Sequence, residues 1–139
     1  LVTTFASVAK NLSMEHALIV HGFDGLDEIT ITDSTYITEL KNKKIISYEI
    51  SPKDFGLSLA QLTEISAQSA NDSLQLVREA FAGEQSAVQD MIALNAGAAL
   101  YVAGKTISIA EGVDLALSLM NNGAAADKLA SYVRVSNNT

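Results

Sequence analysis

The 139-residue chain contains no cysteine, which excludes disulfide bonds, thiolate catalysis and cysteine-ligated zinc. It has a single proline and no low-complexity tract, so no segment is typical of an interdomain linker. Basic residues are scarce: 9 Lys and Arg stand against 16 Asp and Glu, giving a formal net charge of −7. That sign argues against nucleic-acid binding, which needs a basic patch. No apolar run approaches the ~18 residues that cross a bilayer, and no basic leader is visible. We therefore expect a cytoplasmic protein with no membrane contact and a single domain over residues 1–139.

Apolar residues are plentiful, whereas charged residues are few. Hydrophobic residues make up 48% of the chain and charged residues 18%, below the usual fraction of about 25%. This shortfall indicates that part of the surface is normally covered by more protein. Leu1, Phe5, Val8 and Leu12 recur at the spacing of one helical face. Because the chain opens with Leu1 inside an amphipathic helix, we expect a piece of a longer protein.

The first third of the chain has the pattern of an α/β fold. The continuous apolar run 17–20 is typical of a strand buried on both faces. β-branched residues follow over 30–32, and the segments 36–40 and 44–50 predict a hairpin with its turn near Asn42. Ser51 is suited to cap a helix with Pro52 at its first position.

The remainder reads as helices separated by clear cap and stop signals. Helices are predicted from the Ser69–Asp72 region to Gly83, from Ser86 to Gly104, from Ser108 to Gly123, and over 124–133. The second of these is apolar nearly all round between 91 and 103, which predicts a buried helix. Gly97 within it allows a neighbouring element to approach closely. We expect Asn95 to be a structural hydrogen bonder rather than a ligand contact.

One loop carries residues that could do chemistry. The segment 20–29 places Asp24, Asp27 and Glu28 directly after the first strand, among two glycines. Ligands gather at the carboxyl ends of strands in open α/β sheets, and adjacent carboxylates suit a hard cation such as Mg²⁺. The alternative is a solvated acidic turn, because two carboxylates form a weak metal motif. For His21, a structural hydrogen bond is favoured over general-base catalysis.

The same loop closely resembles the V-H-G-x-D-G-L-D-E segment of the anthranilate phosphoribosyltransferase family. The stretch 51–57, S-P-K-D-F-G-L, is similar to that family's P-x-D-F-G-L. The helix 95–104, N-A-G-A-A-L-Y-V-A-G, and the following I-A-E-G at 109–112 are similar to later family segments. The resemblance implies an α/β fold: the C-terminal portion of the nucleoside phosphorylase/phosphoribosyltransferase catalytic domain, with an incomplete mixed sheet flanked by helices.

The resemblance also implies an activity for the parent protein. The family transfers phosphoribosyl from PRPP to the amine of anthranilate, releasing pyrophosphate, in tryptophan biosynthesis. Carried over residue by residue, the magnesium ligands are Asp27 and Glu28, while Asp24 and His21 shape the loop. Members are commonly homodimers. The family's glycine-rich G-T-G-G-D loop, its K-H-G-N-R segment and its helical domain precede the matched region, and none occurs here. We therefore expect the isolated chain to be inactive and to self-associate.

Two alternatives remain open at this stage. One is a related phosphoribosyltransferase or nucleoside phosphorylase with a different acceptor, since acceptor contacts lie outside this chain. The other is a non-catalytic remnant or subunit that awaits a complementary chain.

Overall fold

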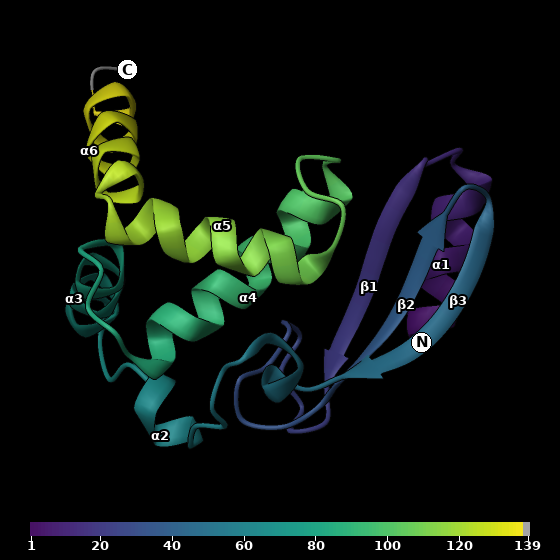
Figure 1. The fold of residues 1–139 in the computed structure, drawn as a ribbon, viewed down its shortest axis with the longest axis horizontal. Coiled ribbons are helices and arrows are strands. Elements are labelled where there is room, and N and C mark those ends of the chain that lie inside the picture. The colour runs from purple at the N-terminus through teal and green to yellow at the C-terminus, as the bar shows by residue number, and fades with distance from the viewer. Residues whose placement is uncertain (138–139) are drawn as a thin grey trace.

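A computed structural model describes residues 1–137 as an elongated α/β molecule with a sheet at one end and helices at the other (Figure 1). In chain order the elements are α1 (Val2–Asn11), β1 (His16–Gly22), β2 (Thr35–Lys41), β3 (Lys44–Ile50), the 3₁₀ turn η1 (Pro52–Phe55), α2 (Leu62–Ile65), α3 (Ala70–Phe81), α4 (Ala87–Val102), α5 (Ile109–Asn121) and α6 (Ala124–Ser136). Helix α1 packs on one face of the sheet, and α4 and α5 cross on the other side (Figure 1).

The sheet has the order β1-β2-β3, and every pairing in the described residues is antiparallel. The family resemblance implies a mixed sheet, with parallel as well as antiparallel strands. No parallel pairing occurs among the strands described in residues 1–137. The predicted hairpin is confirmed: β2 and β3 pair with Lys41 opposite Lys44. Asn42 and Lys43 make the turn with φ angles of 51° and 64°, the left-handed conformation that two-residue hairpin turns require.

Strand periodicity divides the apolar residues between two faces. Leu18, Val20 and Ile37 belong to the main core with α4 and α5, whereas Ala17 and Leu40 form a smaller core with Ala9 of α1. The predicted strand 17–20 is therefore confirmed, but only Ala17 is buried, whereas Leu18, Ile19 and Val20 are half-buried.

Helix α1 does not use the face that its sequence predicts. The stripe of Leu1, Phe5, Val8 and Leu12 is exposed, by 48% at Val8 and 91% at Leu1. Ala6 and Ala9 are the residues that this helix buries. Small alanines let the helix lie close to the sheet, and the large apolar side chains consequently point to solvent. We call Leu1, Phe5, Val8 and Leu12 the outer stripe of α1.

The later helices begin where their caps predict. The hydroxyl of Ser69 accepts the N–H of Asp72, that of Ser86 accepts the N–H of Gln89, and that of Ser108 accepts the N–H of Glu111. Each bond satisfies a helix N–H that has no partner within the helix. The one-turn helix α2 carries no clear sequence signal and is not predicted. No helix described in residues 1–137 has the length and apolar character to cross a bilayer.

Candidate functional site: the acidic loop after β1

Residues 23–30, which we call the acidic loop, connect the end of β1 to the chain that returns to β2. The loop closes on itself because Gly22 N–H donates to the carbonyl of Leu26 at 2.9 Å. A Cβ atom at Gly22 would collide with the Asp24 carboxylate and with Thr30, and Gly25 adopts a φ of 96°. Both glycines are therefore required, one by close packing and the other by backbone conformation.

Asp24 holds the inside of the acidic loop. Its carboxylate accepts the N–H of Leu26 at 3.1 Å and the hydroxyl of Thr30 at 2.5 Å, and it also accepts the hydroxyl of Thr32. Burial alone would raise the pKa of Asp24, but the hydrogen bonds from Thr30, Thr32 and Leu26 outweigh burial and hold the pKa below its ordinary value. The expected loop-shaping role of Asp24 is confirmed.

Asp27 and Glu28 differ from Asp24 in having no partner. Both residues are exposed. Within residues 1–137 neither carboxylate accepts a hydrogen bond or joins an ion pair. No group of three or more His, Cys, Asp or Glu side chains able to hold a metal is found in that range. The loop therefore offers two free carboxylates rather than a closed cage of protein ligands.

Asn95 of α4 fixes the far end of the acidic loop. Its side-chain oxygen accepts the N–H of Ile29 at 3.0 Å, and its amide nitrogen donates to the Ile29 carbonyl at 2.8 Å. The same nitrogen donates to the Met91 carbonyl of its own helix at 3.0 Å. The expectation that Asn95 is a structural hydrogen bonder is confirmed, and its partner is the residue that follows Glu28.

His21 does not make the hydrogen bond predicted for it. Its side chain is exposed and has no side-chain partner among the described residues. The prediction is wrong because alternation along β1 places His21 on the side of the sheet that carries α1, where its side chain is exposed.

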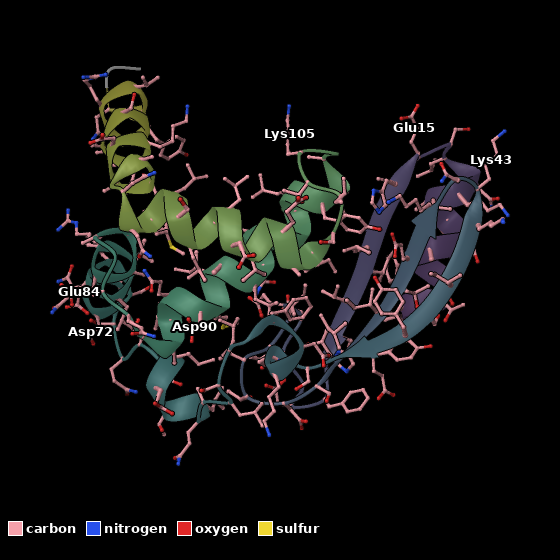
Figure 2. All side chains as sticks on the ribbon, viewed as in Figure 1. Glu15, Lys43, Asp72, Glu84, Asp90 and Lys105 are labelled. Atoms are coloured by element: carbon pink, nitrogen blue, oxygen red, sulfur yellow. The ribbon has the colours of Figure 1, made fainter. Side chains whose placement is uncertain are left out.

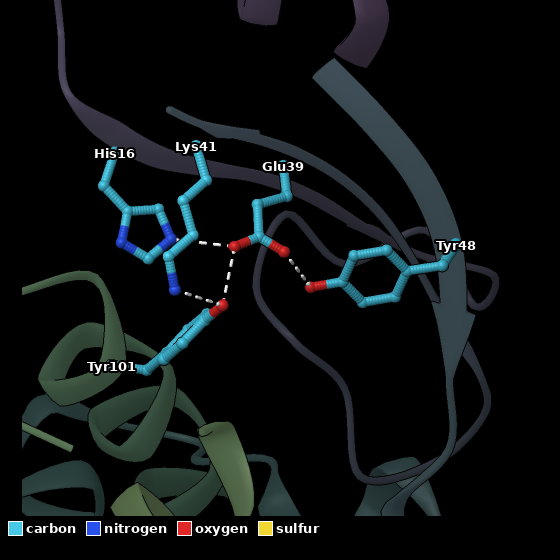
Figure 3. A network of polar contacts seen from close by, with 5 residues as sticks. All are labelled: His16, Glu39, Lys41, Tyr48 and Tyr101. Atoms are coloured by element: carbon cyan, nitrogen blue, oxygen red, sulfur yellow. Dashed lines mark hydrogen bonds and ion pairs between the residues drawn. The ribbon is translucent and has the colours of Figure 1, made fainter. Parts of the chain in front are cut away.

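A polar network around Glu39 lies between the sheet and α4 and was missed from the sequence (Figure 3). Glu39 is only 4% exposed. Its carboxylate accepts the hydroxyls of Tyr101 and Tyr48 at 2.8 and 2.9 Å and lies 2.9 Å from His16 Nε2. Lys41 donates to the Tyr101 hydroxyl at 2.9 Å and lies over its ring. The available signal is Glu39 itself, the one acidic residue in the segment 35–41.

The network sets the ionisation of its members. Burial alone would raise the pKa of Glu39, but hydrogen bonds from Tyr101, Tyr48 and His16 bring it below its ordinary value. Burial and the adjacent Glu39 raise the pKa of Tyr48. Other charged groups, such as Lys43, Glu84 and Lys105, project outward from the ribbon (Figure 2). Glu39 is thus the fixed internal charge of this region, and its carboxylate is held by three contacts from within the chain.

The class of protein follows from a family match that covers most of the chain. Residues 1–126 match the family described as "Glycosyl transferase family, a/b domain". The chain belongs to this glycosyl transferase family.

The curated relatives of the chain are anthranilate phosphoribosyltransferases. The enzyme of Vesicomyosocius okutanii is 46% identical over 136 residues, covering 98% of this chain and 40% of the relative. That of Acetivibrio thermocellus is 39% identical over 137 residues, covering 99% of this chain and 40% of the relative. The chain therefore spans about 40% of the length of these relatives. The family resemblance of the loop and helix motifs is confirmed.

Solved structures of the same enzyme share the fold. Anthranilate phosphoribosyltransferase from Thermus thermophilus superposes with a TM-score of 0.86 at 31% identity, covering 96% of this chain and 39% of that chain. The Saccharomyces cerevisiae enzyme in complex with PRPP and Mg gives a TM-score of 0.85 at 19% identity, covering 99% of this chain and 40% of that chain. The predicted α/β fold class is confirmed, and the match is to the C-terminal portion of the enzyme.

Proposed function

We propose that this chain is the C-terminal part of a magnesium-dependent anthranilate phosphoribosyltransferase. In the whole protein, the bond between the ribose anomeric carbon and the pyrophosphate oxygen breaks, and a bond to the amine nitrogen of anthranilate forms. The amine loses a proton and pyrophosphate leaves. The identity of 39–46% to enzymes of this name over nearly the whole chain supports the proposal most strongly.

The donor chemistry of the acidic loop fits a shared Mg²⁺. Magnesium commonly takes one or two protein carboxylates and fills its remaining positions with water and substrate phosphate. Asp27 and Glu28 are exposed and have no side-chain partner among residues 1–137, so they would supply two hard oxygen ligands and leave the other positions of the ion to water and phosphate. A bound Mg²⁺ supplies positive charge to the diphosphate as it departs.

Asp24 of the loop and Asn95 of α4 are proposed to hold the acidic pair in position. Asp24 holds the first half of the loop, and Asn95 holds the residue after Glu28. Preformed ligand positions reduce the ordering cost when the metal and diphosphate bind. The Glu39 network ties β2 to α4, which carries Asn95, through Tyr101.

The organisation of the parent protein is part of the same proposal. Residues 1–139 form one portion of its α/β domain, and the phosphate loop and acceptor contacts lie in the rest of the protein. We propose a homodimer for the whole protein. For the isolated chain we propose self-association, because the outer stripe of α1 exposes Leu1, Phe5, Val8 and Leu12.

A steady-state assay with PRPP, anthranilate and Mg²⁺ tests the proposal. The longer protein that contains this chain should form phosphoribosyl anthranilate, and chelation of Mg²⁺ should abolish turnover. The 139-residue chain should show no turnover. Failure of the longer protein with anthranilate, together with activity on another acceptor, would contradict the assignment.

A further inference from the structure

The acidic pair is the unpartnered part of a loop that is otherwise held at both ends. At the first end, Asp24 accepts hydrogen bonds from Leu26, Thr30 and Thr32. At the second end, the Ile29 side chain is only 2% exposed and belongs to the main core. Between these points Asp27 and Glu28 are exposed and have no side-chain partner in the described part of the chain. Their position therefore depends on the two groups that flank them.

The second end is held by one side chain that comes from a distant part of the sequence. Asn95 lies 66 residues after Ile29, yet its amide engages both polar atoms of the Ile29 backbone, at 3.0 and 2.8 Å. The pair of bonds resembles the pairing of two peptide groups in a sheet. It fixes the peptide plane between Glu28 and Ile29, and hence the direction in which the Glu28 side chain leaves the backbone.

The chemistry of the contact requires an amide. One oxygen must accept from Ile29 N–H, while the nitrogen must donate to two carbonyls, those of Ile29 and Met91. Only Asn and Gln carry an acceptor and two donors on one group. An Asp at position 95 keeps the acceptor but places its charge against two carbonyl oxygens. A Leu keeps the approximate volume and loses all three bonds.

We propose that Asn95 is a positioning residue that orients Asp27 and Glu28 for a divalent cation. This inference rests on the proposed function of the acidic pair. Groups that orient metal ligands through hydrogen bonds typically change metal affinity by about 10- to 100-fold when they are replaced. We expect a loss near the lower end, about 10-fold, because Asp24 still holds the first half of the loop.

The experiment titrates the 139-residue chain with Mg²⁺ alone. The NMR shifts of the backbone amides of residues 24–30 report binding at each Mg²⁺ concentration. A parallel titration with NaCl at matched ionic strength gives the shifts caused by charge screening, which are subtracted from those caused by Mg²⁺. Asn95→Leu and Asn95→Asp are compared with Asn71→Asp. The last substitution makes the same amide-to-carboxylate change on an exposed residue of α3. Hydrogen exchange of the Ile29 amide is measured on every variant as a metal-free test of the clamp.

Support for the proposal has three parts. Mg²⁺ shifts the loop amides of the unsubstituted chain, Asn95→Leu and Asn95→Asp need about 10-fold more Mg²⁺, and Asn71→Asp matches the unsubstituted chain. Saturating Mg²⁺ should bring the Asn95→Leu spectrum of the loop to the unsubstituted end point. A purely structural role predicts faster exchange at Ile29 with unchanged Mg²⁺ affinity, and that result would overturn the proposal.

Two further outcomes keep the inference separate from the proposed function. If Mg²⁺ alone leaves the loop of the unsubstituted chain unchanged, the positioning role proposed for Asn95 fails, whereas the proposed function is tested separately by Mg²⁺–PRPP binding to the longer protein. If the Asn95 variants do not fold, the side-chain amide of Asn95 in the unsubstituted chain provides the readout. Its resonances should shift and its exchange should slow with Mg²⁺, and an unchanged Asn95 amide beside a responding loop would contradict the role.

Discussion

Gly97 of α4 and Gly112 of α5 lie in direct backbone contact where the two helices cross. A Cβ atom at Gly97 would come within 2.5 Å of the Val113 nitrogen, and one at Gly112 would overlap the Gly97 carbonyl. Because the obstacles are backbone atoms, no side-chain rotation relieves the collision. The crossing carries α4, and with it Asn95, against the core.

The first prediction concerns this crossing. Gly97→Ala or Gly112→Ala should lower the free energy of unfolding by about 3 kcal/mol, because the helices must separate to admit the methyl group. The higher helix propensity of alanine than of glycine offsets only about 1 kcal/mol of this loss. Ser118→Ala on the exposed side of α5 is the control and should cost little. Denaturant unfolding measures the stability of all three variants. An unchanged unfolding midpoint for Gly97→Ala would contradict the prediction, because the helices would then admit the methyl group without cost.

The second prediction concerns Glu39. Glu39→Gln should destabilise the protein at pH 7 by about 2–3 kcal/mol, because the carboxylate loses charge-assisted hydrogen bonds from Tyr101 and Tyr48. Glu49→Gln, on the exposed side of β3, provides the matched control. Equal stabilities of the two variants would contradict the role given to the network.

The same carboxylate predicts a pH dependence. The folded-state pKa of Glu39 lies below its ordinary value of 4.5, so the unfolded chain takes up its proton first as pH falls. The contribution of Glu39 is therefore complete above pH 4.5 and is lost as pH falls through the folded-state pKa. Asp24 adds a change of the same sign below its ordinary value of 3.8. Urea unfolding across this pH range should show that the free energy of unfolding falls less with acid for Glu39→Gln than for the unsubstituted chain.

The third prediction concerns Gly25 of the acidic loop. Gly25 has a φ of 96°, and a methyl group at this position would have no atom of the described residues within 4 Å. Substitution therefore meets backbone strain alone. Gly25→Ala should cost about 1–2 kcal/mol. Gly25→Asn should cost less because Asn visits positive φ more readily. Calorimetric unfolding of the two variants measures the difference, and a larger loss for Asn would contradict this explanation.

The fourth prediction concerns the outer stripe of α1. Phe5→Lys and Val8→Lys together should reduce self-association of the chain, because a charged side chain cannot be buried in an apolar contact without a large cost. Thr4→Lys adds a charge to an exposed position beside the stripe and should leave association unchanged. Light scattering over a concentration series gives the answer. A clean monomer of the unsubstituted chain at high concentration would contradict the proposed association.

Local signals allowed much of the fold to be predicted. The hairpin turn at Asn42 and Lys43 and the serine caps of α3, α4 and α5 are set by residues within three or four positions of each other. Such contacts are visible in the sequence because their partners are neighbours. The acidic loop is likewise visible as contiguous residues. The sequence predicts the loop-shaping role of Asp24 and the structural hydrogen bonding of Asn95, but not their partners.

The failures arose where a partner lies far along the chain. Tyr101 reaches Glu39 across 62 residues, and no periodicity specifies that pairing. The outer stripe of α1 has the spacing of a buried face, yet Ala6 and Ala9 make the contact with the sheet. Helical spacing identifies an apolar face but not which face the rest of the protein covers. His21 failed for a different reason: alternation along β1 places it on the face of the sheet that carries α1, where it is exposed.

Asp27 and Glu28 are proposed to hold the Mg²⁺ that accompanies PRPP. Calorimetry of Mg²⁺–PRPP binding to the longer protein, with both residues replaced by Ala, tests it directly. Replacement of Glu15 and Glu84 by Ala removes two exposed charges elsewhere and serves as the control. We predict that the acidic-loop variant loses at least about 10-fold in affinity while the control binds normally. An acidic-loop variant that binds Mg²⁺–PRPP as tightly as the unsubstituted protein would contradict the account.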